Sequence, residues 1–164
     1  MTEAMQENRI KALFWFPVAL FPVCNLASML LTEADNDISI TWVFGAVAEE
    51  LFFRGFLLKT ILLPRIKPKH AIVLISLLFA AMHLLNLRSG TTFPAILPQI
   101  FFAFCFSIWA GAVVWRKGSI LIPMLAHVLL NLTAVTEGML IPLAVSVIVL
   151  ADGILLLKGS ENEQ

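Results

Sequence analysis

Three apolar stretches of this 164-residue chain each contain a few ionisable or strongly polar side chains. The set consists of Glu49, Glu50, Arg54, His83, His127 and Asn131. Carboxylate, imidazole and amide groups together suit hydrolysis, because a carboxylate in a cavity of low dielectric constant can take a proton from water near neutral pH. A histidine beside it would hold the attacking water, and a second histidine with an asparagine amide would stabilise the oxyanion.

The spacing of these residues assigns them to helix faces. Glu50 and Arg54 are four residues apart, so they share one face and can pair. Glu49 is rotated by about 100° from Glu50, so one carboxylate can neutralise Arg54 while the other faces a cavity. His127 and Asn131 are also four residues apart. We therefore expect three helices to direct Glu49, His83, His127 and Asn131 towards one point.

The composition indicates a protein that lies in a membrane. Hydrophobic residues make up 60% of the chain and charged residues 13%, with a mean hydropathy of +0.93. Soluble domains carry about 25% charged residues. This chain has too few of them to cover a surface exposed to water. The formal net charge is zero and gives no sign of a nucleic-acid partner. We expect one all-α domain, residues 1–164, with the lipid bilayer as its surroundings.

A polytopic bundle of about six transmembrane helices is expected, since a span needs about 20 apolar residues. Prolines inside these stretches fit, because membrane helices tolerate them. Cys24 and Cys105 lie within apolar stretches and are predicted to be buried free thiols. The expected spans are about Ala12 to Leu31, Ile38 to Leu63, Ala71 to Leu87, Phe93 to Trp115, Ser119 to Val135 and Met139 to Leu157.

The distribution of basic residues predicts the orientation. Of the 11 Lys and Arg residues, Arg54 lies within a span and Arg88 alone would lie on one side of the membrane. The others flank the spans on the opposite side, which places both termini in the cytoplasm. Glu49 would then be about ten residues, or ~15 Å, from the outer face. The site is therefore expected in the outer half of the bilayer.

At these residues the sequence resembles the CPBP intramembrane proteases, the CAAX-protease and bacteriocin-processing (Abi) family. Its three motifs, EExxxR, FxxxH and HxxxN, stand here in order as Glu49-Glu50-Leu-Phe-Phe-Arg54, Phe79-Ala-Ala-Met-His83 and His127-Val-Leu-Leu-Asn131. The resemblance covers about residues 40–135. It implies that Glu49 activates water with the help of His83, that His127 and Asn131 bind the oxyanion, and that Glu50 and Arg54 form a supporting ion pair.

The resemblance and the orientation together predict a substrate and a location. We expect a membrane-anchored protein or peptide precursor, cut near its extracytoplasmic membrane boundary in a bacterial inner (plasma) membrane. A C-terminal sorting signal and a leader peptide are the two candidates. A metal-free mechanism without a cofactor is favoured. The alternative is zinc bound by Glu49, His83 and His127 with one open position, although the chain has no HExxH motif.

Two other classes of function stay open at this point. The chain could be a non-catalytic membrane scaffold or a bacteriocin-immunity protein with the same fold. It could also be a small transporter or proton path, since intramembrane Glu and His mark those as well. Taken singly, His83, His127 and Asn131 would more often be hydrogen-bonding residues between helices. Phe79 is most simply a packing residue, and Asp152, near the end of the last apolar stretch, has no predicted partner.

Overall fold

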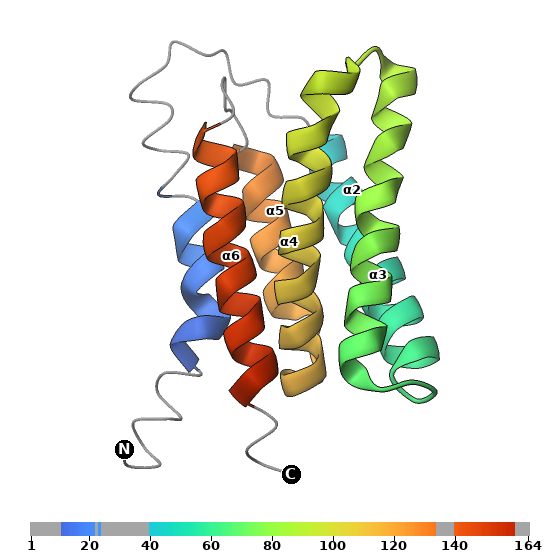
Figure 1. The fold of residues 1–164 in the computed structure, drawn as a ribbon, viewed down its shortest axis with the longest axis vertical. Coiled ribbons are helices and arrows are strands. Elements are labelled where there is room, and N and C mark those ends of the chain that lie inside the picture. Colours follow the sequence, from blue (N-terminus) through green and yellow to red (C-terminus); the bar gives the residue numbers. More distant parts are fainter. Residues whose placement is uncertain (1–10, 22, 24–39, 134–139, 160–164) are drawn as a thin grey trace.

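The computed structural model describes residues 11–21, 23, 40–133 and 140–159, and every regular element in these ranges is a helix (Figure 1). An N-terminal helix covers Lys11–Phe21. The elements after it, in chain order, are α2 (Ile40–Glu50), η1 (Leu51–Leu62), α3 (Pro68–Met82), η2 (His83–Ser89), α4 (Phe93–Lys117), α5 (Leu121–Thr133) and α6 (Leu140–Gly159).

The helices form one bundle in which successive rods run in opposite directions (Figure 1). α2 continues directly into η1, and α3 into η2, so each pair makes one rod. The N-terminal helix begins, and α6 ends, at the same end of the bundle as the turns before α3 and after α4 (Figure 1). Most basic residues of the described ranges lie near this end, which we call the basic end: Lys11, Lys59, Arg65, Lys67, Lys69, Arg116, Lys117 and Lys158.

η1 is a π-helix that starts directly after the two glutamates. Its last turn has the i→i+5 pattern of a π-helix: the N–H of Leu63 donates to the carbonyl of Leu58 at 2.9 Å. The hydroxyl of Thr60 donates to the carbonyl of Gly55, five residues earlier, at 3.1 Å. The guanidinium of Arg65 donates to the carbonyl of Ile61 at 2.6 Å and satisfies the end of the helix. π-Helical segments occur frequently at functional sites, and this one contains the last four residues of the EExxxR motif, Leu51 to Arg54.

α3 starts at Pro68, whose missing N–H costs nothing in the first turn of a helix. The rod tightens into the 3₁₀ segment η2 at His83, and it ends at Gly90, whose φ of 92° is left-handed. This change of helix type matters locally, because the N–H of His83 bonds to Ala80 and Ala81. The carbonyl of Phe79 therefore loses its α-helical donor.

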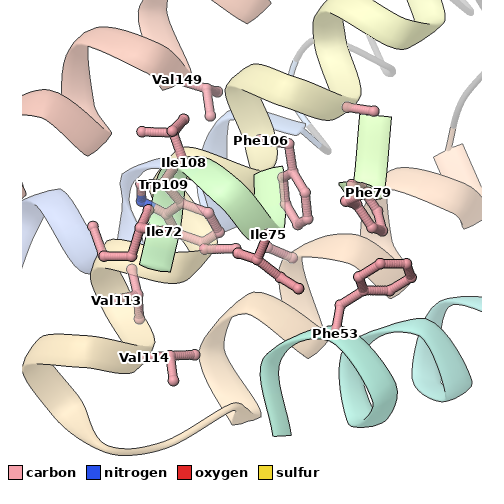
Figure 2. Close-up of a cluster of buried hydrophobic side chains, with 14 of the residues drawn as sticks. Phe53, Ile72, Ile75, Phe79, Phe106, Ile108, Trp109, Val113, Val114 and Val149 are labelled. Carbon is pink, nitrogen blue, oxygen red and sulfur yellow. The ribbon is translucent and has the colours of Figure 1, made fainter. Parts of the chain in front are cut away.

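α4 lies at the centre of the bundle and contributes more buried core residues than any other described helix. It is buried nearly continuously from Ala103 to Val114, and it packs against both α3 and α6. Figure 2 shows Phe106, Trp109 and Val113 of α4 among side chains of α3, η1 and α6. Gly111 allows α4 to pack closely on α3, because an added Cβ at this position would lie 2.9 Å from Cγ2 of Ile72.

The helices match the expected spans closely within the described ranges, and the all-α class is confirmed. Two rods, Pro68–Ser89 and Phe93–Lys117, are long and apolar enough to cross a membrane, and two shorter apolar helices cover Lys11–Phe21 and Leu121–Leu132. The count of about six spans is not confirmed by this criterion. Cys105 is buried with a free thiol, as predicted, whereas Cys24 and residues 24–31 of the first expected span fall outside the described residues.

Candidate active site

Glu50 lies at the centre of the predicted cluster. Its side chain is fully buried, and Oε1 accepts a hydrogen bond from Nη1 of Arg54 at 2.9 Å. The same oxygen lies 2.9 Å from Nδ1 of His127 on α5. Because a carboxylate oxygen accepts, Nδ1 of His127 is the donor in this bond. Glu50, the last residue of α2, therefore joins α2 to α5 as well as pairing with Arg54, and it leaves Nε2 as the free nitrogen of the His127 ring.

Glu49 has a different environment from its neighbour. Its side chain is 44% exposed, and Oε2 lies 3.8 Å from Nε2 of His127. The two adjacent carboxylates thus contact the two nitrogens of one imidazole ring: Glu50 binds Nδ1 from the interior, and Glu49 faces Nε2 from the open side. The rotation of about 100° between neighbouring helical residues produces this division, as the sequence predicted.

His83 is held by the backbone of its own helix. Nδ1 lies 3.1 Å from the carbonyl oxygen of Phe79, so Nδ1 carries the hydrogen and donates it. This is the carbonyl that the change from α3 to η2 left without a backbone donor. The ring is close enough to Glu49, His127 and Arg54 to interact electrostatically with all three. His83 therefore also presents Nε2 as its free nitrogen, in the same tautomer as His127.

Phe79 is the packing centre of the site. Its ring lies 5.3 Å from the ring of His83 and 5.9 Å from that of His127, both near edge-to-face. The guanidinium of Arg54 lies over its face, 4.1 Å from the ring centroid. Within the described residues, Nε and Nη2 of Arg54 have no hydrogen-bond partner, so the guanidinium is held by Glu50 and by cation–π contacts with Phe79 and Phe106. Figure 2 shows Phe79 next to Phe53 of η1, and their centroids are 5.1 Å apart.

Asn131 lies one turn beyond His127 on α5. Its amide Nδ2 donates to the carbonyl oxygen of Trp42 on α2 at 3.2 Å, and the amide has a second N–H besides the one used in this bond. At the opposite end of the same helix pair, the ammonium of Lys59 donates to the carbonyl of Gly118, in the turn before α5. α2–η1 and α5 are thus joined at three heights, with the bond from His127 to Glu50 in the middle.

The structure brings five of the six predicted residues into one cluster, which contains Glu49, Glu50, Arg54, His83 and His127. Asn131 adjoins the cluster through α5 but bonds to the backbone of α2. Sequence reasoning missed the bond between Glu50 and His127, because no spacing along one helix reveals a contact between two helices. It also missed the bond from Nδ2 of Asn86 to Oε1 of Gln99, 3.2 Å long, which joins η2 to α4.

The donor set gives no ready metal site in this conformation. In the part of the chain that the structure describes, no three His, Cys, Asp or Glu side chains are grouped so that they could hold a metal ion. Oε2 of Glu49 and Nε2 of His127 are 3.8 Å apart. Carboxylate oxygens and imidazole nitrogens are both common zinc ligands. The alternative of zinc on Glu49, His83 and His127 stays a prediction.

The fold and the cluster define a class: an apolar helical bundle with paired carboxylates and two histidines gathered at one site. A protein-family model described as Type II CAAX prenyl endopeptidase Rce1-like matches residues 36–133. That match covers more than half of the chain and includes all three motifs. The chain belongs to this family, whose members are CPBP-type intramembrane proteases, and it is an integral membrane protein. No curated protein and no solved structure matches it.

Proposed function

We propose that the chain is an intramembrane endopeptidase in which Glu49 activates water without a metal ion. The observation that carries this proposal is the difference in burial and bonding between the carboxylates of Glu49 and Glu50. Glu50 is enclosed and bonded to Arg54 and His127, so it has no free access to water. Glu49 is half-exposed and faces Nε2 of His127. Only Glu49 is positioned to meet both water and a peptide bond.

The reaction follows from these positions. Glu49 takes a proton from water while the water oxygen forms a bond to the peptide carbonyl carbon. Nε2 of His83, left free by the bond from Nδ1 to Phe79, orients the water. Nε2 of His127, when it carries a proton, and the second amide hydrogen of Asn131 donate to the oxyanion. Glu49 then passes its proton to the leaving amine as the carbon–nitrogen bond breaks.

The substrate that fits best is a membrane-anchored protein or peptide precursor, cut near the membrane boundary opposite the basic end. His83 follows the last residue of α3, which begins at the basic end, and Asn131 lies near the end of α5 far from that side. If the basic end is cytoplasmic, the site lies in the outer half of the bilayer. Reporter fusions in the acidic stretch of sequence that contains Glu33, Asp35 and Asp37 test this orientation. A cytoplasmic reporter signal from that stretch would overturn it.

The proposed mechanism is tested with the Glu49→Gln variant. Membranes from cells that contain the wild-type protein or the variant are compared for new N- and C-termini of membrane proteins. A candidate peptide is then cleaved with the purified proteins. We expect Glu49→Gln to insert normally and lose at least about 10²-fold in cleavage rate, while Glu33→Gln, an isosteric control outside the matched segment, retains activity. Full cleavage by Glu49→Gln would refute the mechanism and favour the non-catalytic scaffold.

A further inference from the structure

The N-terminal helix and α6 lie outside the segment that matches the family, residues 36–133. Both nevertheless pack on the matched core. α6 lies along α4, with Val145, Val149 and Leu156 in the shared hydrophobic core. From the N-terminal helix, Phe21 contributes its ring 6.1 Å from that of Phe106 on α4. Apolar packing alone gives membrane helices little specificity, because lipid tails are equally apolar. Specific docking of these two helices therefore depends on polar contacts.

The first polar contact has its origin in a proline. Pro17 lacks an N–H, so it cannot donate to the carbonyl of Leu13, four residues earlier in the N-terminal helix. The indole Nε1 of Trp109 on α4 donates to this carbonyl at 3.3 Å. Trp109 is fully buried. A donor from the core thus replaces the backbone donor that Pro17 removed, and the N-terminal helix is fixed to α4 at this height.

The second polar contact is made by α6 at the same tryptophan. Asp152 is only 4% exposed, and neither of its carboxyl oxygens has a hydrogen-bond partner among the described residues. The carboxyl is close enough to the indole N–H of Trp109 to interact with it electrostatically. The next residue, Gly153, allows the approach, because a Cβ there would lie 2.9 Å from the backbone N and Cα of Trp109. Asp152, Trp109 and the carbonyl of Leu13 therefore meet where three helices cross.

The junction connects to the candidate active site through one aromatic ring. The centroid of the Trp109 ring system lies 5.6 Å from that of Phe106, and the Phe106 ring lies 5.2 Å from that of His127. The guanidinium of Arg54 also faces Phe106, 5.5 Å from its centroid. Figure 2 shows Phe106 and Trp109 on adjoining turns of α4. Phe106 is thus supported on one side by the junction and contacts two site residues on the other.

We propose that Trp109 and Asp152 are positioning residues, which dock the N-terminal helix and α6 and, through Phe106, hold the His127 ring in its catalytic position. This inference rests on the proposed peptidase function for its effect on rate, but the docking itself does not. The polar group on α6 and the indole donor on α4 act together. Losing either one lets Phe106 shift and moves Nε2 of His127 away from Glu49.

The test uses the full-length protein in detergent and four variants. Trp109→Phe removes the indole N–H and keeps an aromatic ring, and Asp152→Leu removes the carboxyl. Asp152→Asn keeps an oxygen that can accept from the indole, and Trp115→Phe is the matched control on the same helix. We expect kcat for the peptide identified above to fall about tenfold in Trp109→Phe and Asp152→Leu with little change in KM. Asp152→Asn and Trp115→Phe should stay within about twofold of wild type.

A second readout does not depend on catalysis. Cys105, adjacent to Phe106 and buried, is alkylated by a small maleimide in a Cys24→Ser background. Trp109→Phe and Asp152→Leu should raise its alkylation rate several-fold, whereas Asp152→Asn should not. If wild type cleaves the peptide and all four variants match it in kcat and in alkylation, the junction proposal is wrong. If wild type does not cleave but alkylation changes as expected, the docking stands and the peptidase function fails.

Discussion

Nδ1 of His127 lies 2.9 Å from Oε1 of Glu50, and Nε2 of the same ring lies 3.8 Å from Oε2 of Glu49. Two consecutive residues of α2 therefore contact one imidazole on α5: Glu50 binds Nδ1, and Glu49 faces Nε2. The inner carboxylate fixes the orientation and the tautomer of the ring. This leaves the outer carboxylate, half-exposed, as the group that can exchange protons with water. The consequences of this arrangement can be measured separately for stability and for rate.

Neutralising each carboxylate in turn should separate these two effects. Glu50→Gln leaves the buried Arg54 without an anionic partner, and losing one partner of a buried ion pair costs about 3–5 kcal/mol in soluble interiors. Glu49→Gln changes a half-exposed group and should leave the unfolding temperature nearly unchanged. Both variants should lose cleavage. Thermal unfolding in detergent, measured beside activity, would contradict this assignment if Glu49→Gln proved the less stable of the two.

The ion pair can be tested further by removing both members. Arg54→Met alone leaves Glu50 buried with only His127 as a partner. The double variant Glu50→Leu/Arg54→Met removes both buried charges and should be destabilised by less than the sum of the two single variants, with a coupling of about 0.5–3 kcal/mol. Unfolding of the four proteins of this cycle gives the coupling directly. Strict additivity would mean that the 2.9 Å contact contributes nothing to stability.

The tautomer of His83 gives a prediction about two similar substitutions. In His83→Asn, the amide nitrogen can take the place of Nδ1 and keep the bond to the carbonyl of Phe79, but nothing replaces Nε2. In His83→Gln, the amide reaches the position of Nε2. If Nε2 orients the water, His83→Gln should retain more activity than His83→Asn, which should lose about 10²-fold or more. Steady-state kinetics on both variants decide this, and equal losses would remove His83 Nε2 from the mechanism.

Two glycines of different surroundings test the packing. An added Cβ at Gly153 would lie 2.9 Å from backbone atoms of Trp109, which cannot move aside as a side chain can. Gly153→Ala should destabilise by about 1–3 kcal/mol, the usual cost of overpacking. Nothing lies within 4 Å of the corresponding position at Gly45, so Gly45→Ala should be neutral or stabilising because alanine favours helix. Unfolding of both variants tests whether α6 is docked as closely as described.

Sequence reasoning predicted the helical rods well, because apolar length and proline or glycine punctuation determine where a membrane helix begins and ends. The rod from Ile40 to Leu62 was expected at residues 38–63, and the rod from Phe93 to Lys117 at 93–115. The helix type could not be predicted. Nothing in the residues from Leu51 to Leu62 distinguishes a π-helix from an α-helix, since both bury apolar residues and satisfy the backbone within one segment.

In the candidate site too, contacts within one helix could be predicted from the sequence, whereas contacts between helices could not. The pair of Glu50 with Arg54 follows from spacing along one helix, and the structure confirms it. The bond from His127 to Glu50 spans 77 residues of sequence, and it depends on how α5 is rotated against α2. Asn131 was expected to point into the site with His127, and its bond to Trp42 was not foreseen. Asp152 had no predicted partner, because the indole that it approaches lies on another helix.

The three hydrogen bonds between α2–η1 and α5 have a consequence for how the protein can move. Asn131 binds Trp42 near one end, His127 binds Glu50 in the middle, and Lys59 binds the turn at Gly118 near the other end. Helices joined at three heights move as one body. Opening of the bundle for a substrate therefore has to occur on the other side of Glu49, where α3 and η2 carry His83. Substrate entry would then displace His83, which we propose to orient the water, while α2–η1 and α5, with the proposed oxyanion donors His127 and Asn131, stay together.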